Sequence, residues 1–156
     1  MISKEDIKHL EKIFPFWLDM KQNDRAKIIL SSRILSLKKN SIFFNSHELD
    51  GLLFLKSGKL RFFLSSLDAR ELPLYYLNNM EVEFFENFND KTISTILDIA
   101  FIVEKNSEIL LIPYSVLNLF RDKYSIMEKF LHNLTREKLS KSLLSLQNIL
   151  LIPLKD

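Results

Sequence analysis

The sequence predicts a mainly β fold with flanking helices, and three observations lead to this prediction. First, short apolar runs alternate with polar breaks from residue 34 to residue 112. Second, the segments before and after this region carry apolar residues at helical spacing, three or four apart. Third, the chain has 13 phenylalanines, which suit a β-rich core of large side chains. About eight short strands with regular turn signals are typical of a sandwich or a barrel.

The predicted strands are apolar runs bounded by polar turn residues. They cover residues 34–37, 42–44, 52–55, 60–64, 72–77, 92–97, 99–103 and 108–112. The Ser57-Gly58 pair between two of these runs predicts a tight hairpin.

Helices are predicted before the strands. Ser3 is followed three residues later by Asp6, which is the spacing of a capping box at the start of a helix. Pro15 should end that helix, because it lacks a backbone donor. A second helix should begin at Asn23 or Asp24.

A short and a long helix are predicted after the strands. Pro113 suits the first position of the short helix, and the long helix should open at a second capping box, Ser125 to Glu128. The apolar positions of the long helix are Met127, Phe130, Leu131, Leu134, Leu139, Leu143, Leu146 and Leu150. A slip of five residues separates Leu134 from Leu139, which predicts that the helix changes the surface it packs against. Basic residues between these positions, which alternate with Glu128 and Glu137, are expected to form a solvated face; they are Lys129, Arg136, Lys138 and Lys141.

Composition excludes several classes of function. With 22 basic and 20 acidic residues, a net charge of +2 gives no strong field toward nucleic acid or a membrane. The absence of cysteine excludes a disulfide framework, a thiolate nucleophile and a Cys-ligated iron–sulfur cluster, and it fits a cytoplasmic protein. Only two glycines occur, Gly51 and Gly58, so Gly-rich phosphate loops are excluded. The longest charge-free stretch, residues 142–154, is shorter than the ~18 residues that suggest a membrane span.

Candidate ligands for cofactors are few. His9, His47 and His132 are the only histidines, and they are the only His candidates for a haem axial ligand. His47 is the single histidine of its polar loop, whereas a cupin metal site needs several at set spacings. No base, nucleophile and orienting group recur in a recognisable pattern, so the sequence does not predict an enzyme.

Three segments carry a family resemblance: Phe14-Pro15-Phe16-Trp17, residues 51–61 and Ile112-Pro113. They are similar to parts of the effector domain of Crp/Fnr-family transcription regulators. The first resembles the family's entry segment, the second its most recognisable hairpin, and the third the strand that leaves the roll. Residues 68–75 resemble the next turn, with Ala69 where the family usually has glycine. The resemblance implies an antiparallel double-stranded β-roll, jelly-roll-like, followed by a long C-terminal dimerisation helix. It divides the chain into an effector domain at 1–124, a dimerisation helix at 125–148, and the start of an absent DNA-binding domain at 149–156.

One departure from the family concerns cyclic nucleotides. Family members that bind cyclic AMP hold its phosphate with a Gly-Glu turn, backbone amides and an arginine. Residues 78–91 contain no glycine and no arginine, and four acids there would repel an anion: Glu81, Glu83, Glu86 and Asp90. We therefore expect that cyclic AMP does not bind.

The aromatic, acidic segment 81–88 is the best candidate for the effector region, and its effector is unknown. The candidate pocket residues are Arg61, Tyr75, Glu81, Glu83, Phe84, Phe85 and Lys91. Alternatively, Arg61 forms a surface ion pair and binds no effector. The aromatic residues could likewise be ordinary core residues that line no pocket.

The sequence also predicts a homodimer that has no membrane contact and reaches DNA only through the absent domain. Leu139, Leu143, Leu146 and Leu150 recur at spacings of four, three and four, the rhythm of a two-helix seam. The expected dimer residues also include Met127, Phe130 and Leu134, which either cover the roll or begin the seam. The expected function is signal sensing and dimerisation in a Crp/Fnr-type regulator. A stand-alone β-roll interaction module and a cupin-like metal protein are the alternatives.

Overall fold

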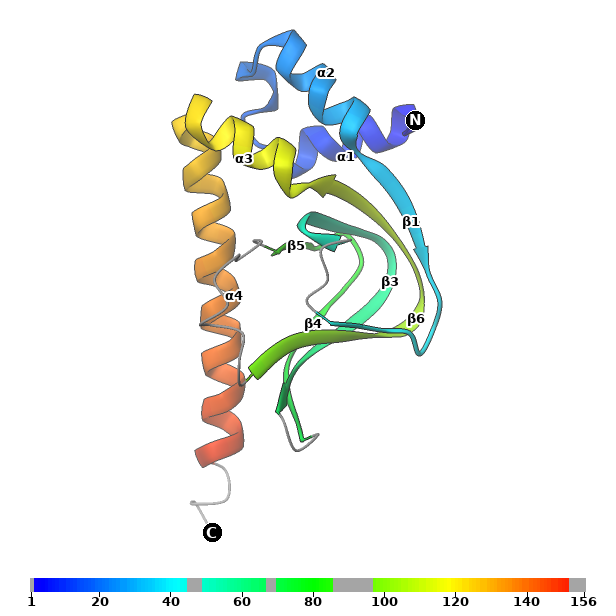
Figure 1. Ribbon diagram of the computed structural model, residues 1–156, viewed down its shortest axis with the longest axis vertical. Helices are drawn as coiled ribbons and strands as arrows, with labels where there is room; N and C mark the ends of the chain where they lie inside the picture. The colour runs from blue at the N-terminus through cyan, green and yellow to red at the C-terminus, as the bar shows by residue number, and fades with distance from the viewer. Residues whose placement is uncertain (1, 45–48, 67–69, 86–96, 152–156) are drawn as a thin grey trace.

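A computed structural model describes residues 2–44, 49–66, 70–85 and 97–151 (Figure 1). The helices of these ranges are α1 (Lys4–Ile13), a 3-10 turn η1 (Trp17–Asp19), α2 (Gln22–Ser31), α3 (Tyr114–Lys123) and α4 (Ser125–Leu151). The strands are β1 (Arg33–Leu37), β2 (Ile42–Phe44), β3 (Gly51–Ser66), β4 (Glu71–Leu77), β5 (Val82–Phe85) and β6 (Leu97–Pro113).

All six described strands join one antiparallel sheet. Its main path is β1-β6-β3-β4, with β2 also paired to β6 and β5 also paired to β3. β3 and β6 pair along nearly their whole length, from Gly51 opposite Pro113 to Ser66 opposite Leu97. These two strands bend together, so that the sheet curls into a roll (Figure 1). The predicted fold class, an antiparallel roll with flanking helices and a long C-terminal helix, is confirmed.

Two of the predicted strand boundaries are wrong. The Ser57-Gly58 pair is not a hairpin turn, because β3 runs through it, and the polar segment 105–107 likewise lies inside β6. The pairing register shifts on both sides of Gly58, whose φ is +117° and at which an added Cβ would meet Ser107 Oγ. Glycine therefore marks a bend in a long strand pair and not a chain reversal.

Strand β5 lies in a segment where the apolar pattern did not predict a strand. Its sequence is Val82-Glu83-Phe84-Phe85, and its ladder with β3 places Glu83 opposite Leu53. The predicted strand at 92–97 falls outside the described residues, apart from Leu97 at the start of β6.

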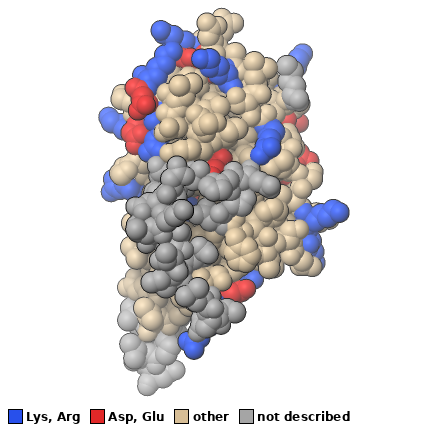
Figure 2. Space-filling model, in the orientation of Figure 1, with Lys and Arg blue, Asp and Glu red and all other residues tan. Residues whose placement is uncertain are grey.

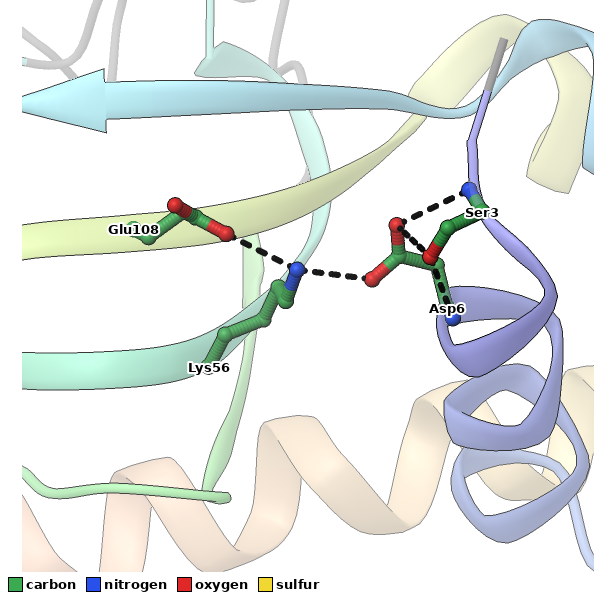
Figure 3. A network of polar contacts seen from close by, with 4 residues as sticks. All are labelled: Ser3, Asp6, Lys56 and Glu108. Carbon is green, nitrogen blue, oxygen red and sulfur yellow. Dashed lines mark hydrogen bonds and ion pairs between the residues drawn. The ribbon is translucent and has the colours of Figure 1, made fainter.

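The capping box of α1 is confirmed, and it belongs to a larger polar network (Figure 3). The Asp6 carboxylate accepts from the Ser3 backbone and hydroxyl, at 3.1 and 2.9 Å. Lys56 of β3 lies between Asp6 and Glu108 of β6, with both ion pairs at 2.8 Å. Burial opposes ionisation of Asp6, but the hydrogen bonds from Lys56 and Ser3 prevail and lower its pKa. The network joins the first helix to the bend of the two long strands.

Two apolar clusters form the core. One fills the space between the sheet and the helices and includes Phe14, Trp17, Phe120 and Met127. The other lies inside the roll around Phe62. Pro113 is the N-cap of α3, one position before the predicted one. Ser125 is the first helical residue of α4 and not the N-cap of the predicted capping box, since the Glu128 amide donates to the Tyr124 carbonyl. The first turns of α4 pack on the helical cluster, and the rest of α4 runs along the open side of the roll beside β4 and β5 (Figure 1).

Charge on the face shown in Figure 2 is mixed. Basic and acidic side chains lie close together at its helical end, and most of the described surface beside them is uncharged. Among the described helices, none combines the length and the apolar character needed to cross a bilayer.

Candidate effector site

An apolar cavity of about 300 Å³ lies between the open side of the roll and α4. Each of four strands contributes an apolar side chain to its wall. These residues are Leu64 of β3, Leu74 of β4, Phe84 of β5 and Ile99 of β6. The α4 side of the cavity is lined by Thr135, Lys138, Leu139, Ser142, Leu143 and Leu146.

Beside this cavity, a buried carboxylate is paired with a lysine and a tyrosine. Glu83 is 5% exposed, and its Oε1 lies 3.0 Å from Nζ of Lys138. Its Oε2 accepts a 2.7 Å hydrogen bond from the Tyr75 hydroxyl. Burial and the neighbouring carboxylate raise the pKa of Tyr75 far above its usual range. The phenol therefore stays protonated and donates a hydrogen bond to Glu83.

Strand alternation explains why an acid is buried here. Successive side chains of β5 point to opposite faces, so Glu83 and Phe85 face the same way. Phe85 packs with Phe62 of the roll cluster at a ring distance of 5.7 Å, whereas Phe84 belongs to the helical cluster. A charge on an apolar face must be paired to be tolerated, and Lys138 supplies the pair.

Lys138 was expected on a solvated helical face, and that expectation is wrong. Its ammonium group also donates to the Phe84 carbonyl at 3.2 Å, and it lies 4.6 Å from the ring centroid of Phe85. A signal for this position was present in the sequence. Lys138 follows Leu131 by seven residues, and Leu131 is fully buried, so both lie on the stripe of α4 that faces the rest of the chain.

The other predicted pocket residues lie elsewhere. Arg61 is not among the lining residues, and it pairs on the roll with Glu104 at 2.8 Å and with Glu71 at 3.9 Å. Glu81 accepts from the Asn78 backbone at 2.7 Å and so closes a turn. Lys91 lies outside the described residues. Of the seven predicted residues, Phe84 lines the cavity, Glu83 and Phe85 contact Lys138, which also lines it, and Tyr75 contacts Glu83.

The five-residue slip in α4 coincides with a change of environment, as the sequence predicts. Before it, Met127 is fully buried in the chain's own core, and Phe130 and Leu134 pack against the same cluster. After it, Leu139, Leu143 and Leu150 are 58%, 56% and 68% exposed, and Leu146 is half-buried at the cavity. A fully buried Met127 has no surface to offer a second chain, so of the predicted dimer residues the four leucines after the slip are the ones that keep exposed or half-buried surface.

The chain is similar to known proteins in its structure, whereas comparisons of its sequence found no match. No family model and no curated protein matches the sequence. A Eubacterium rectale protein described as a transcriptional regulator of the crp/fnr family superposes with a TM-score of 0.76 at 23% identity, over 89% of this chain and 64% of that chain. The chain has the Crp/Fnr fold. A variant of CooA from Carboxydothermus hydrogenoformans (TM-score 0.57, 13% identity, 85% of this chain, 84% of that chain) and CprK C200S (TM-score 0.52, 14% identity, 76% and 56%) share it.

The described histidines are not placed to hold a haem in the cavity. One structure with the Crp/Fnr fold is described as the reduced, Fe(II) CO-sensing protein of R. rubrum, and a haem iron needs an axial ligand from the protein. His9 lies on α1 against Phe54, with ring centroids 5.0 Å apart, and His132 is exposed on α4. Neither lines the cavity, and His47 falls outside the described residues. The described part of the chain also holds no group of three or more side chains suited to a metal ion.

Proposed function

We propose that this chain is the signal-sensing and dimerisation domain of a Crp/Fnr-type transcription regulator, and that it acts by binding rather than by catalysis. The observation that carries the proposal is the position of the cavity. Three leucines of α4, namely Leu139, Leu143 and Leu146, line the cavity and also belong to the predicted seam. A ligand there would contact the residues through which two chains associate, which is what a sensor that reports through a dimer requires.

The exposed leucines support a second copy of the chain as the partner of α4. A parallel pair of helices places each leucine near its own symmetry mate, as a two-fold interface requires. Leu139, Leu143 and Leu150 are each more than half exposed, and three such side chains along one stripe are typical of an interaction surface.

The proposal includes no cyclic AMP. Among the described residues that line the cavity, Lys138 is the charged one and is already paired with Glu83 beside it, and none is an arginine that could clamp a phosphate. Contact with DNA is proposed only for a further domain of a whole regulator. The chain spans 64% of the Eubacterium rectale regulator's length.

Light scattering on a matched pair of variants tests the proposed dimer. Leu143 and Leu144 are 56% and 59% exposed, and they point in different directions because successive helical residues are ~100° apart. The wild-type chain should have twice the monomer mass of 18.5 kDa at micromolar concentration. Leu143→Glu should give monomers, because it places like charges opposite each other across the seam, and Leu144→Glu should leave the dimer intact. A monomeric wild type, or equal effects of the two variants, would contradict the proposal.

A further inference from the structure

We propose that the cavity between the roll and α4 selects an uncharged, largely apolar ligand and rejects anions, because the one cationic side chain among its described lining residues is already neutralised by Glu83. This inference rests on the proposed function, since it assigns a chemical class to the ligand of the same site. It concerns the role of Glu83, which is a determinant of ligand charge and does not itself line the cavity.

The described lining of the cavity is mostly apolar. Apolar side chains reach the cavity from four strands and from α4. A volume of about 300 Å³ lies at the lower end of the range for small-molecule sites. A ligand of one or two rings therefore suits this space, and apolar contact supplies most of its binding.

The charge of Lys138 at the cavity is already paired. Lys138 is the one charged side chain among the described lining residues, and an unpaired lysine there would attract an anion. Its ammonium group instead donates to Glu83 and to the Phe84 carbonyl, and it lies over the Phe85 ring. The site therefore carries a cation and an anion 3.0 Å apart, with no net charge.

Glu83 is held in its pairing with Lys138 by a second contact. Its carboxylate is fixed from the far side by the Tyr75 hydroxyl at 2.7 Å, and Tyr75 stacks on Phe62 at a ring distance of 5.0 Å. A ligand carboxylate or phosphate could reach Lys138 only by displacing Glu83 or by lying beside it. Displacement leaves a buried carboxylate unpaired, and proximity sets two like charges against each other, so both routes oppose anion binding.

The remaining polar lining groups suit a hydrogen bond from a neutral ligand. The hydroxyls of Thr135 and Ser142 donate to the α4 carbonyls of Leu131 and Lys138, at 3.1 and 2.9 Å. Each hydroxyl oxygen keeps acceptor capacity. A ligand with one hydroxyl or amine donor on an apolar body matches this arrangement.

A matched pair of fluorescent probes tests the inference on the full chain. Naphthylamine is a two-ring amine that is neutral at pH 7, and naphthylamine sulfonate has the same two rings with one negative charge. The neutral probe should bind the wild-type protein at least ten times more tightly than the sulfonate. Glu83→Gln keeps the shape and an acceptor for Tyr75 but releases the charge of Lys138, so it should shift the affinity ratio toward the sulfonate by at least tenfold. Glu81→Gln removes a neighbouring acid that closes a turn away from the cavity, and it should leave the ratio unchanged.

The outcomes separate this inference from the proposed function. A Ser142→Phe variant fills the cavity, and loss of the neutral probe in that variant locates the binding. Circular dichroism checks that the variant is folded, and Thr135→Phe replaces it if it is not. If the neutral probe does not bind the wild type, or still binds both variants with a filled cavity, the proposed effector cavity is wrong. If the probe binds in the cavity but the sulfonate binds as tightly in the wild type, or if Glu83→Gln leaves the ratio unchanged, the cavity stands and the charge selection is wrong.

Discussion

Replacing Lys138 by methionine should destabilise the folded chain by about 3 kcal/mol. The substitution keeps most of the apolar stem but leaves the Glu83 carboxylate, 5% exposed, without its cation. Breaking a buried ion pair in this way costs about 3–5 kcal/mol. The lower end applies because the hydrogen bond from Tyr75 remains and because the Lys138 side chain is 20% exposed.

Urea unfolding followed by tryptophan fluorescence measures this loss. Trp17 is the single tryptophan of the chain and lies in the helical core cluster, so its emission reports unfolding. With a denaturant slope of about 2 kcal/mol/M, a loss of about 3 kcal/mol lowers the midpoint by about 1.5 M. Protein concentration must be the same in every sample, because dimerisation would add to the apparent stability.

Two further variants identify the cause of the loss. Glu83→Gln combined with Lys138→Met removes both charges, and it should recover more than half of the stability lost in the single variant. Lys141→Met removes an exposed lysine one turn further along α4, and it should change the stability by less than about 0.5 kcal/mol. If Lys138→Met is as stable as Lys141→Met, or if the double variant recovers nothing, Glu83 does not depend on Lys138 and the reasoning fails.

Two other predictions concern the cavity and the first helix. Calorimetric titration with cyclic AMP should give no binding, because an anion meets Glu83 and no arginine; a micromolar dissociation constant would refute this. Asp6→Asn should lower the free energy of unfolding by about 1–2 kcal/mol at pH 7, since it weakens charged hydrogen bonds to Lys56 and Ser3. The pKa of Asp6 is held below its ordinary value of 3.8, so its stabilisation is present above that pH and is lost as the pH falls through the lower value of the folded state. The difference between Asp6→Asn and the wild type should therefore shrink as the pH falls below about 4, and a difference that stays constant from pH 7 to the lowest pH at which the chain is folded would contradict this.

Local signals in the sequence were sufficient for most element types. Ser3 and Asp6 are three residues apart, and the helix start they predict depends on contacts within one turn. Gly58 shows where local reading fails. A glycine permits a turn or a bulge equally well, and the choice here depends on Ser107, which lies opposite it in β6. The sequence placed strands on both sides of this glycine but could not tell that they are one strand.

The candidate site shows the same limit more strongly. The sequence singled out Glu83 and Phe85 within the aromatic, acidic segment and Tyr75 before it. The structure places Glu83 and Phe85 against Lys138, and Tyr75 against Glu83. Lys138 itself was missed, because it is 55 residues from Glu83 and stands in a helix whose other charges are exposed. Arg61 was attractive for its charge, yet its partners Glu71 and Glu104 come from the neighbouring strands on either side. Pairing between distant segments decides which charges are available to a ligand, and no local pattern contains that information.

The two halves of α4, before and after the slip, suggest how ligand binding and dimerisation are linked. Above the slip, apolar side chains such as Met127 and Leu131 fix the helix in the core. Below it, polar contacts reach the roll: Lys138 bonds to Glu83 and to the Phe84 carbonyl, and the Ser145 hydroxyl donates to the Pro73 carbonyl at 2.9 Å. Leu139, Leu143 and Leu150 of this half are more than half exposed, so it makes less apolar contact with the rest of the chain than the half above the slip. A ligand that fills the cavity adds apolar contact there, and it does so through leucines that would also meet a second chain. On our proposals, the affinity of two chains for each other should therefore depend on whether the cavity is filled.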